Sequence, residues 1–421
     1  MGRDLVAALA RRLPLATTVA GPASWYGVAT AVSHGSRVVS AVLLARAFST
    51  ADFTAYSYFG LTAAMVASYS SLGLGVVTSR LAAEAGPRRP WPAGTLALVS
   101  MCGALAGAAV LLLLPEPWVT AGLDVPRWLL AASAILIALQ TVPEGAALGL
   151  ERYREVAAVS LLHGAGLLGS AALAVRHDLP LLAMAGIAAG AVLNVAGHGG
   201  VVARATGWSS LRRGAVIRMS DVAGVARVLG PMYATNLLAV SSAWLVGRLI
   251  LVAGDQAFAL YAIGYSWFGL GLWLPNVMGR IVLARLAQML RNSRAAAREL
   301  LRQTLVAAGL ATCAIGGAVL AVGPFLSSLY GANYAVNRWI VAAYFGAALV
   351  RAPAGLLGSA IIADDGQREW LRCHMTHAVV LLAATAAALG GGAWAGVTGY
   401  SASGICLVLL GYRACRRRRL I

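Results

Sequence analysis

Apolar runs of about 20 residues recur along this chain and are separated by short polar connectors, and a run of that length suffices to cross a lipid bilayer. In hydrocarbon, such a segment satisfies its own backbone hydrogen bonds only as an α-helix. Of the 421 residues, 60% are hydrophobic and 11% are charged, and the mean hydropathy is +0.77. These values exclude an ordinary soluble domain. The sequence therefore predicts an all-α polytopic membrane protein.

The pattern predicts about twelve transmembrane helices in two six-helix lobes around a central cavity. We expect an amino-terminal lobe with a short amphipathic amino terminus (1–203), a basic cytoplasmic linker (204–226), and a carboxyl-terminal lobe with a basic tail (227–421). The expected helices are 24–47, 54–79, 93–115, 128–150, 156–175, 180–203, 227–253, 258–284, 302–325, 338–362, 371–391 and 394–413.

The charge distribution predicts the orientation in the membrane. All 33 basic residues are arginines, and with 15 acidic residues they give a formal charge of +18, which in a soluble protein would suggest nucleic acid. Here the arginines concentrate in alternate connectors and in the tail Arg416–Arg419, whereas the opposite connectors hold only Arg127, Arg176 and Arg338. By the positive-inside rule, we expect a multi-pass protein of the cell membrane with both termini cytoplasmic. We expect anionic lipids as partners at the cytoplasmic face, and no nucleic acid.

The two halves show a weak internal repeat, which favours a parallel duplication with a pseudo-two-fold axis along the membrane normal. A shift of 203 residues aligns one pair of acids and one pair of tyrosines, and a shift of 210 aligns a proline and a glycine in the fourth helix of each half. The pairs are Asp52 with Asp255, Tyr58 with Tyr261, Pro143 with Pro353, and Gly145 with Gly355.

Five arginines lie inside the predicted helices. An arginine at a helix centre costs roughly 2.5–3.5 kcal/mol on insertion scales, so it needs water, a counter-charge or an anionic ligand beside it. Arg37 and Arg351 lie near the middle of their helices, and we predict that they bind substrate. Arg46, Arg248 and Arg280 lie near helix ends, where their side chains can reach the headgroups; Arg248 and Arg280 are secondary candidates.

Other intramembrane polar residues extend the predicted site. His34 precedes Arg37 by three positions on the same face of the first helix, and Gln140 and Glu144 share a face of the fourth. Glu144 either neutralises an arginine, Arg37 or Arg351, or carries a coupling ion, H⁺ or Na⁺. Asn236 in the seventh helix is a further substrate-binding candidate, although an isolated polar side chain in a bundle usually bonds a neighbouring helix.

Aromatic residues cluster in the seventh and eighth predicted helices, away from the helix ends. Trp267 is the secondary candidate among them, together with Trp244, Tyr261, Tyr265 and Trp273. Their ring faces can stack on sugars, but packing explains such a cluster more often.

The sequence contains no pattern typical of a cofactor or of catalysis. Its five cysteines are scattered without paired spacing, so they predict neither a disulfide framework nor a zinc site. Asp364 and Asp365 form the only acidic pair inside a connector that we place in the cytoplasm, where a solvated turn explains them better than a metal site. We expect no cofactor, no metal and no enzymatic activity.

Several segments resemble a known group of transporters. The segment SRVVSAVLLARAFSTADFTAYSYFGLTAAMVASYSSLGLGVVTSRLAAE (36–84) resembles the opening hairpin of Wzx-type oligosaccharide flippases, which belong to the multidrug/oligosaccharidyl-lipid/polysaccharide (MOP) exporter superfamily. GAALGLERYREVAAV (145–159), the segment 230–288 and LLGSAIIADDGQREW (356–370) also follow the pattern of that family. The likeness extends over most of the chain, through motifs that the superfamily shares.

This resemblance implies twelve helices, a cationic central cavity and alternating access. The implied substrate is a polyprenyl-pyrophosphate-linked glycan, moved from the cytoplasmic to the outer leaflet for the assembly of cell-surface polysaccharide, with glycan-assembly enzymes as associated proteins. Arg37 and Arg351 would bind the pyrophosphate by charge and paired donors. The family has no strict substrate motif, so the depth of these two arginines in the membrane is what selects them.

Two alternatives stay open. A cation-coupled multidrug exporter of the same superfamily would favour an acidic cavity, for which only Glu144 speaks. A non-transporting scaffold for glycan assembly could keep the same fold, although buried arginines argue against it. A membrane glycosyltransferase or polymerase would need a sizeable exterior loop or an acidic metal motif, and the exterior connectors are short.

Overall fold

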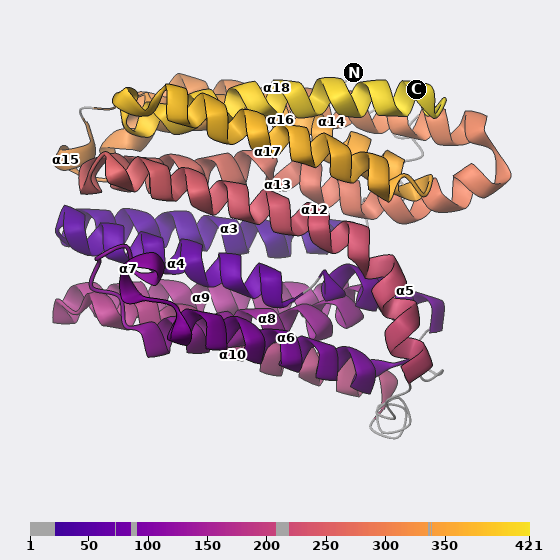
Figure 1. Cartoon of the computed structure of the whole chain (residues 1–421), viewed down its shortest axis with the longest axis horizontal. Coiled ribbons are helices and arrows are strands. Elements are labelled where there is room, and N and C mark those ends of the chain that lie inside the picture. Colours follow the sequence, from indigo (N-terminus) through magenta and orange to yellow (C-terminus); the bar gives the residue numbers. More distant parts are fainter. Residues whose placement is uncertain (1–21, 72, 86–90, 208–218, 336, 338) are drawn as a thin grey trace, which may run out of the picture.

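A computed structural model describes residues 22–71, 73–85, 91–207, 219–335, 337 and 339–421, which form α-helices joined by short connectors (Figure 1). Helices of the first half form one lobe, and helices of the second half form the other beside it. The first lobe contains α3 (Pro22–Ala47), α4 (Thr50–Ser70), α5 (Leu74–Ala85), α6 (Ala93–Leu113), the short α7 (Glu116–Val119), α8 (Arg127–Gly149), α9 (Tyr153–His177) and α10 (Pro180–Thr206).

The second lobe repeats the arrangement, and its first three crossings are longer than those of the first lobe. It contains α12 (Met219–Val252), α13 (Asp255–Asn292), α14 (Arg294–Ser328), the short α15 (Ala332–Ala335), α16 (Ile340–Ala363), α17 (Gln367–Ala387), the 3₁₀ turn η1 (Leu389–Gly391) and α18 (Ala393–Arg417).

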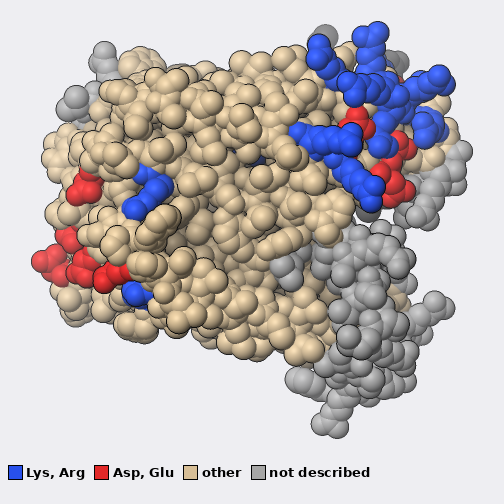
Figure 2. Space-filling model, viewed as in Figure 1, with Lys and Arg blue, Asp and Glu red and all other residues tan. Residues whose placement is uncertain are grey.

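The prediction of an all-α multi-pass membrane protein is confirmed. In the described part of the chain, ten helices are long and apolar enough to cross a membrane. The other two expected crossings correspond to α4 with α5 and to α17, which pack inside the same bundle. Charged side chains gather at its two ends and leave a broad uncharged band between them (Figure 2).

Two details of the predicted helices were wrong. The range 54–79 was expected to be one helix, but α4 ends at Ser70 and α5 begins at Leu74, because Gly73 adopts a left-handed conformation with φ of 73°. The helices α13 and α14 have 38 and 35 residues, much longer than expected. At about 1.5 Å per residue they exceed the hydrocarbon thickness of about 30 Å, so they extend beyond it.

The fourth crossing of each half packs against the second through a glycine. A Cβ on Gly145 of α8 would collide with the carbonyl oxygen of Gly75 in α5. The aligned Gly355 of α16 lies against α13, where a Cβ would meet Oδ1 of Asn276 at 3.4 Å. A small residue is therefore required for close helix approach at Gly145, whereas a Cβ at Gly355 would make an ordinary contact.

The lobes meet along α3 and α4 of the first and α12 and α13 of the second. Hydrogen bonds cross between the lobes in the half of the bundle that lies away from the carboxyl terminus. Thr54 Oγ1 donates to the Asp255 carbonyl at 3.0 Å, and Trp244 Nε1 donates to Thr62 Oγ1 at 3.1 Å. A shared apolar cluster covers this junction, with Phe53 and Tyr58 from the first lobe among residues of the second. The lobes are therefore in close contact at the end of the bundle opposite the carboxyl terminus, which we call the opposite end.

At the other end, which we call the basic end, the tail packs against the second lobe. Arg418 Nε donates to Glu369 Oε2 at 2.8 Å, and Arg418 also contacts Asp364 Oδ2 at 3.0 Å. The hydrogen bond with Glu369 raises the pKa of Arg418. Arg298 Nε donates to the Arg419 carbonyl at 2.7 Å. The tail and the starts of α14 and α17 thus form one network, and Asp364, expected to be a solvated turn residue, anchors it.

The remaining arginines near the end of the last helix lie at the edge of this network or outside it. Arg413, Arg416 and Arg417 line a surface hollow of about 440 Å³. Of the three, Arg417 approaches Glu369, at 3.9 Å, while most of its side chain stays exposed. They belong to the basic group at the end of the molecule that carries the carboxyl terminus (Figure 2). The tail is therefore divided into a docked part, Arg418 and Arg419, and an outward-facing part.

Candidate functional site

Arg37 lies at mid-length of α3, on the face that also carries Thr30. Its side chain is exposed although it lies at mid-length of the helix. Its electrostatic neighbours are Tyr56 of α4 and Glu144 of α8. Arg37 forms no direct ion pair among the described residues, so Glu144 acts on it without contact. Of the two arginines proposed as partners of Glu144, the structure selects Arg37.

Two histidines lie near this pair. His163 of α9 accepts a hydrogen bond at Nδ1 from Asn194 Nδ2 of α10, at 3.1 Å, and Arg37 and Glu144 both act on it electrostatically. His198, 2% exposed, is also near Glu144, and neither of its ring nitrogens has a hydrogen-bond partner among the described residues. Among the described residues of the first lobe, the half-buried Glu144 thus lies near an arginine and two histidines.

Two further candidates accompany these residues in the first lobe. His34 is half-buried, one turn from Arg37 on α3. Gln140 is half-buried one turn from Glu144 on α8, and its Oε1 has no partner among the described groups. Both sequence-predicted polar stripes therefore exist, on α3 and on α8.

Arg351 occupies the interior of the second lobe, at mid-length of α16. Its guanidinium carbon lies 5.8 Å from the centre of the Phe268 ring of α13. The phenols of Tyr265 and Tyr400 act on it electrostatically, as do His374 and His377 of α17. No carboxylate is among these neighbours within the described side chains. Arg37 and Arg351 therefore have different surroundings, each supplied by its own lobe.

Two candidates take part in contacts between the lobes. Asn236 Nδ2 of α12 donates to the Ser68 carbonyl of α4 at 3.4 Å, a long hydrogen bond. Arg248 NH2 donates to the Pro117 carbonyl of α7 at 2.8 Å, which links α12 to the first lobe at the opposite end. Arg248 is therefore a contact between the lobes. This contact explains an arginine at that position without a side chain that extends to the lipid headgroups.

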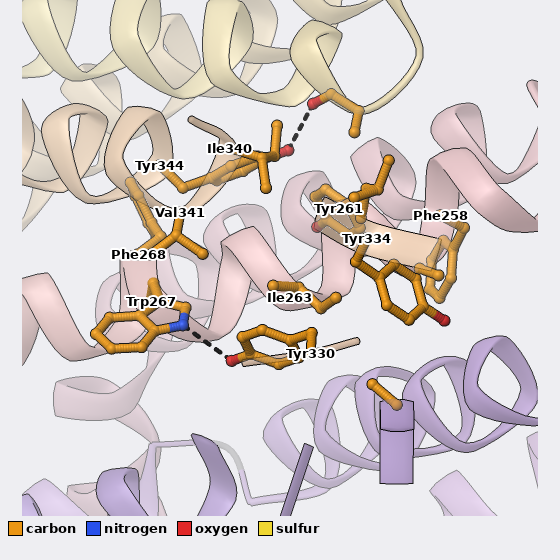
Figure 3. Close-up of a cluster of buried hydrophobic side chains, with 14 of the residues drawn as sticks. Phe258, Tyr261, Ile263, Trp267, Phe268, Tyr330, Tyr334, Ile340, Val341 and Tyr344 are labelled. Carbon is orange, nitrogen blue, oxygen red and sulfur yellow. Dashed lines mark hydrogen bonds between the residues drawn. The ribbon is translucent and has the colours of Figure 1, made fainter. Parts of the chain in front are cut away.

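Trp267 is part of the packed core. It is 8% exposed, and its Nε1 donates to the Tyr330 hydroxyl at 2.9 Å (Figure 3). With its ring packed and its only polar atom bonded, the indole has no face left for a sugar, so its proposal as a secondary site residue is corrected. The side chain of Arg280 lies outside the described residues.

Sequence reasoning missed the residues that distinguish the two arginines. Tyr56 and Tyr400 were not among the predicted candidates, Tyr265 was named only as part of an aromatic cluster, and the packing brings them to Arg37 or Arg351. The sequence also did not single out the histidines of α17, His374 and His377, whose ring centres lie 5.7 Å apart. A spacing of three residues was the one available signal for that pair.

The chain matches no protein-family model, and none of the curated proteins matches it in sequence. Solved structures do match its fold. A mutant of the Vibrio cholerae MATE transporter VcmN is 16% identical, with a TM-score of 0.68, covering 96% of this chain and 99% of that one. The eukaryotic MATE transporter AtDTX14 is 14% identical, with a TM-score of 0.68 and the same coverage.

An inward-facing multidrug resistance MATE family transporter of the MOP superfamily has a TM-score of 0.69 at 14% identity, over 94% of each chain. An outward-facing structure of such a transporter has a TM-score of 0.67 at 13% identity, over 94% of this chain and 95% of that one. At these identities the likeness establishes the fold alone. The chain therefore has a MATE-like fold over nearly its whole length.

Proposed function

We propose that this protein flips a polyprenyl-pyrophosphate-linked oligosaccharide from the cytoplasmic to the outer leaflet of the cell membrane, by alternating access, for cell-surface polysaccharide assembly. The observation that supports it is the presence of one arginine at mid-membrane depth in each lobe of a transporter fold. A pyrophosphate needs such cations, whereas its polyprenyl chain can remain in the bilayer. Both termini would be cytoplasmic, as the arginine distribution predicts.

The exposure of Arg37 and the polar groups near it support a role in binding. Arg37 is exposed and offers a planar set of donors to a pyrophosphate. His34, Gln140 and Asn236 would complete the sugar-binding surface by hydrogen bonds. Arg351 would contribute the second cation from the other lobe, so that the pyrophosphate is held between lobes.

Glu144 would couple transport to H⁺ or Na⁺. It opposes Arg37 electrostatically, and it has two histidines as neighbours. Protonation of Glu144, or occupation by a cation, would change the net charge that a pyrophosphate meets at Arg37. In proteoliposomes, Glu144→Gln should abolish the response of transport to the ion gradient, and an unchanged response would remove Glu144 from coupling.

The test of the proposed function uses Arg37→Ala and Arg351→Ala in intact cells. Each should strand lipid-linked glycan on the inner leaflet at unchanged protein level, because the pyrophosphate loses one cation. Arg46→Ala is the matched control, since Arg46 is an exposed arginine at the end of the same helix α3. Normal glycan export by both single variants would refute the proposal for this site.

A cation-coupled multidrug exporter is the second candidate function. The solved structures similar to this chain include a multidrug resistance transporter. The half-buried carboxylate of Glu144 near Arg37 is the feature that favours it. Accumulation of cationic dyes in cells lacking the protein, restored by the wild type but not by Glu144→Gln, would select this function. If the protein is a scaffold for glycan-assembly enzymes, glycan assembly should be unchanged by all of these substitutions.

Anionic lipids are the proposed partners at the cytoplasmic face. The outward-facing Arg413, Arg416 and Arg417 support this role, because they surround a hollow at the basic end, where headgroups would lie.

A further inference from the structure

We propose that the second lobe binds a monovalent inorganic anion, such as chloride, at Arg351. The site lies between α13, α16, α17 and α18, at mid-membrane depth. Among the described residues, Arg351 is the only permanently charged group that we find in it, and the surrounding side chains are aromatic or imidazole. This site is separate from the neighbourhood of Arg37 and Glu144 in the first lobe.

The charge of Arg351 is not neutralised by the part of the protein that the structure describes. The described residues give it no hydrogen bond and no ion pair, and the Phe268 ring centre lies 5.8 Å from its guanidinium carbon. A cation over a ring gains about 0.5–2 kcal/mol, less than the roughly 2.5–3.5 kcal/mol that an arginine costs at a helix centre. Arg351 is only half-buried, so part of the residue stays accessible. A bound anion would supply the missing compensation.

A second observation comes from His374. This side chain is 7% exposed, and its Nδ1 is buried with no hydrogen-bond partner among the described groups. Its ring packs edge-on against Trp370, with centres 4.8 Å apart, so the imidazole is fixed in place. A buried nitrogen without a partner costs about 1–3 kcal/mol, and an anion that accepts its N–H would remove that cost.

The neighbouring groups define the polarity of the site. His377 Nδ1 lies 3.0 Å from the Ser403 carbonyl, which can only accept, so Nδ1 carries the proton. The half-buried Tyr265 adds a hydroxyl that can donate. Since no described carboxylate acts on Arg351, a metal cation has no ligand of opposite charge there. The site is therefore suited to anions.

Charge balance favours a monovalent anion over a polyvalent one. One arginine with neutral imidazoles carries one positive charge, and a pyrophosphate in its place would leave uncompensated negative charge inside the lobe. In the first lobe, Glu144 already supplies one negative charge for Arg37. If the proposed function holds, substrate pyrophosphate meets both arginines and displaces the anion; this displacement rests on the proposed function, whereas anion binding does not.

The experiment measures thermal unfolding of the full-length protein in detergent while chloride replaces gluconate at constant ionic strength. Chloride should raise the Tm saturably, by roughly 2–4 °C, because it binds the folded state. Arg351→Gln should abolish the rise, and Arg37→Gln, the matched control in the other lobe, should retain it. Equilibrium binding of radiolabelled chloride to the wild type should give about one site per chain, reduced at least tenfold by Arg351→Gln.

A second variant keeps the test decisive if Arg351→Gln fails to fold. His374→Asp places a carboxylate near Arg351 and should remove the chloride effect while raising the Tm in gluconate. A chloride effect that persists in His374→Asp or in Arg351→Gln, or no saturable chloride binding to the wild type, would overturn the proposal. Stabilisation by inorganic pyrophosphate alone would also overturn it, and would support the proposed function. Chloride binding together with normal glycan export by both arginine-to-alanine variants would instead refute only the proposed function.

Discussion

The interiors of the two lobes each contain an arginine at the same depth, but among the described residues only the first lobe provides a carboxylate for it. Arg37 has Glu144, with His163 close by, whereas Arg351 has an aromatic ring and phenols. In the second lobe, acidic residues lie instead at the basic end, where Asp364 and Glu369 bind Arg418. Two similar helical frameworks therefore surround an arginine inside the membrane with different groups. The position of each arginine along its helix does not reveal this difference.

The largest loss of stability should follow from removing the carboxylate near Arg37, so that this arginine, like Arg351, has no carboxylate beside it. Glu144→Leu leaves Arg37 without its carboxylate and should lower the free energy of unfolding by roughly 1–3 kcal/mol. Thermal or denaturant unfolding in detergent measures the loss. In the double variant Arg37→Leu with Glu144→Leu, part of the loss should be recovered, because the two charges interact. Additive losses would show that the carboxylate does not compensate Arg37.

A smaller effect should follow from breaking the acid–base network of the second lobe. Arg418→Ala removes the contacts with Glu369 and Asp364 and should destabilise the protein by about 1–2 kcal/mol. The raised pKa keeps Arg418 charged, so this stability is present at neutral pH and is lost at the alkaline side only as the pH rises through that raised pKa. Arg416→Ala is the matched control and should change stability by less than about 0.5 kcal/mol. Equal losses would contradict the division of the tail into docked and outward-facing parts.

The smallest effect should come from the aromatic core between these regions. Trp267→Phe keeps most of the buried ring but loses the hydrogen bond to Tyr330, so it should cost about 1 kcal/mol. Tyr330→Phe, which removes the partner of the same bond, should match it. Transport by both variants should stay near the wild-type rate. A large loss of transport by Trp267→Phe at unchanged stability would instead indicate that the indole contacts the substrate.

The helical framework could be predicted from the sequence because bilayer thickness sets the period of apolar runs. The break at Gly73 was not predicted because the serines before it form only a short polar stretch and apolar residues resume at Leu74. The true ends of α13 and α14 were not predicted because these helices continue past the membrane, where hydropathy no longer marks them. For the candidate site, the sequence predicted the positions of Arg37 and Arg351 near the middle of their helices. It did not predict which residues surround them. Tyr56 and Glu144 reach Arg37 only through tertiary packing of three helices.

The contacts that join the lobes at the opposite end also limit how access to the interior can be switched. Apart from Arg248, which binds a carbonyl, the hydrogen bonds described there join neutral groups, as between Thr54 and the Asp255 carbonyl and between Trp244 and Thr62. Each such bond contributes only about 0.5–1.5 kcal/mol net. A junction of this kind can part without separating paired charges in a low-dielectric medium. Its rate of opening should therefore depend little on ionic strength and strongly on the packing of Phe53 and Tyr58, which makes temperature, more than salt, the variable that governs the exchange.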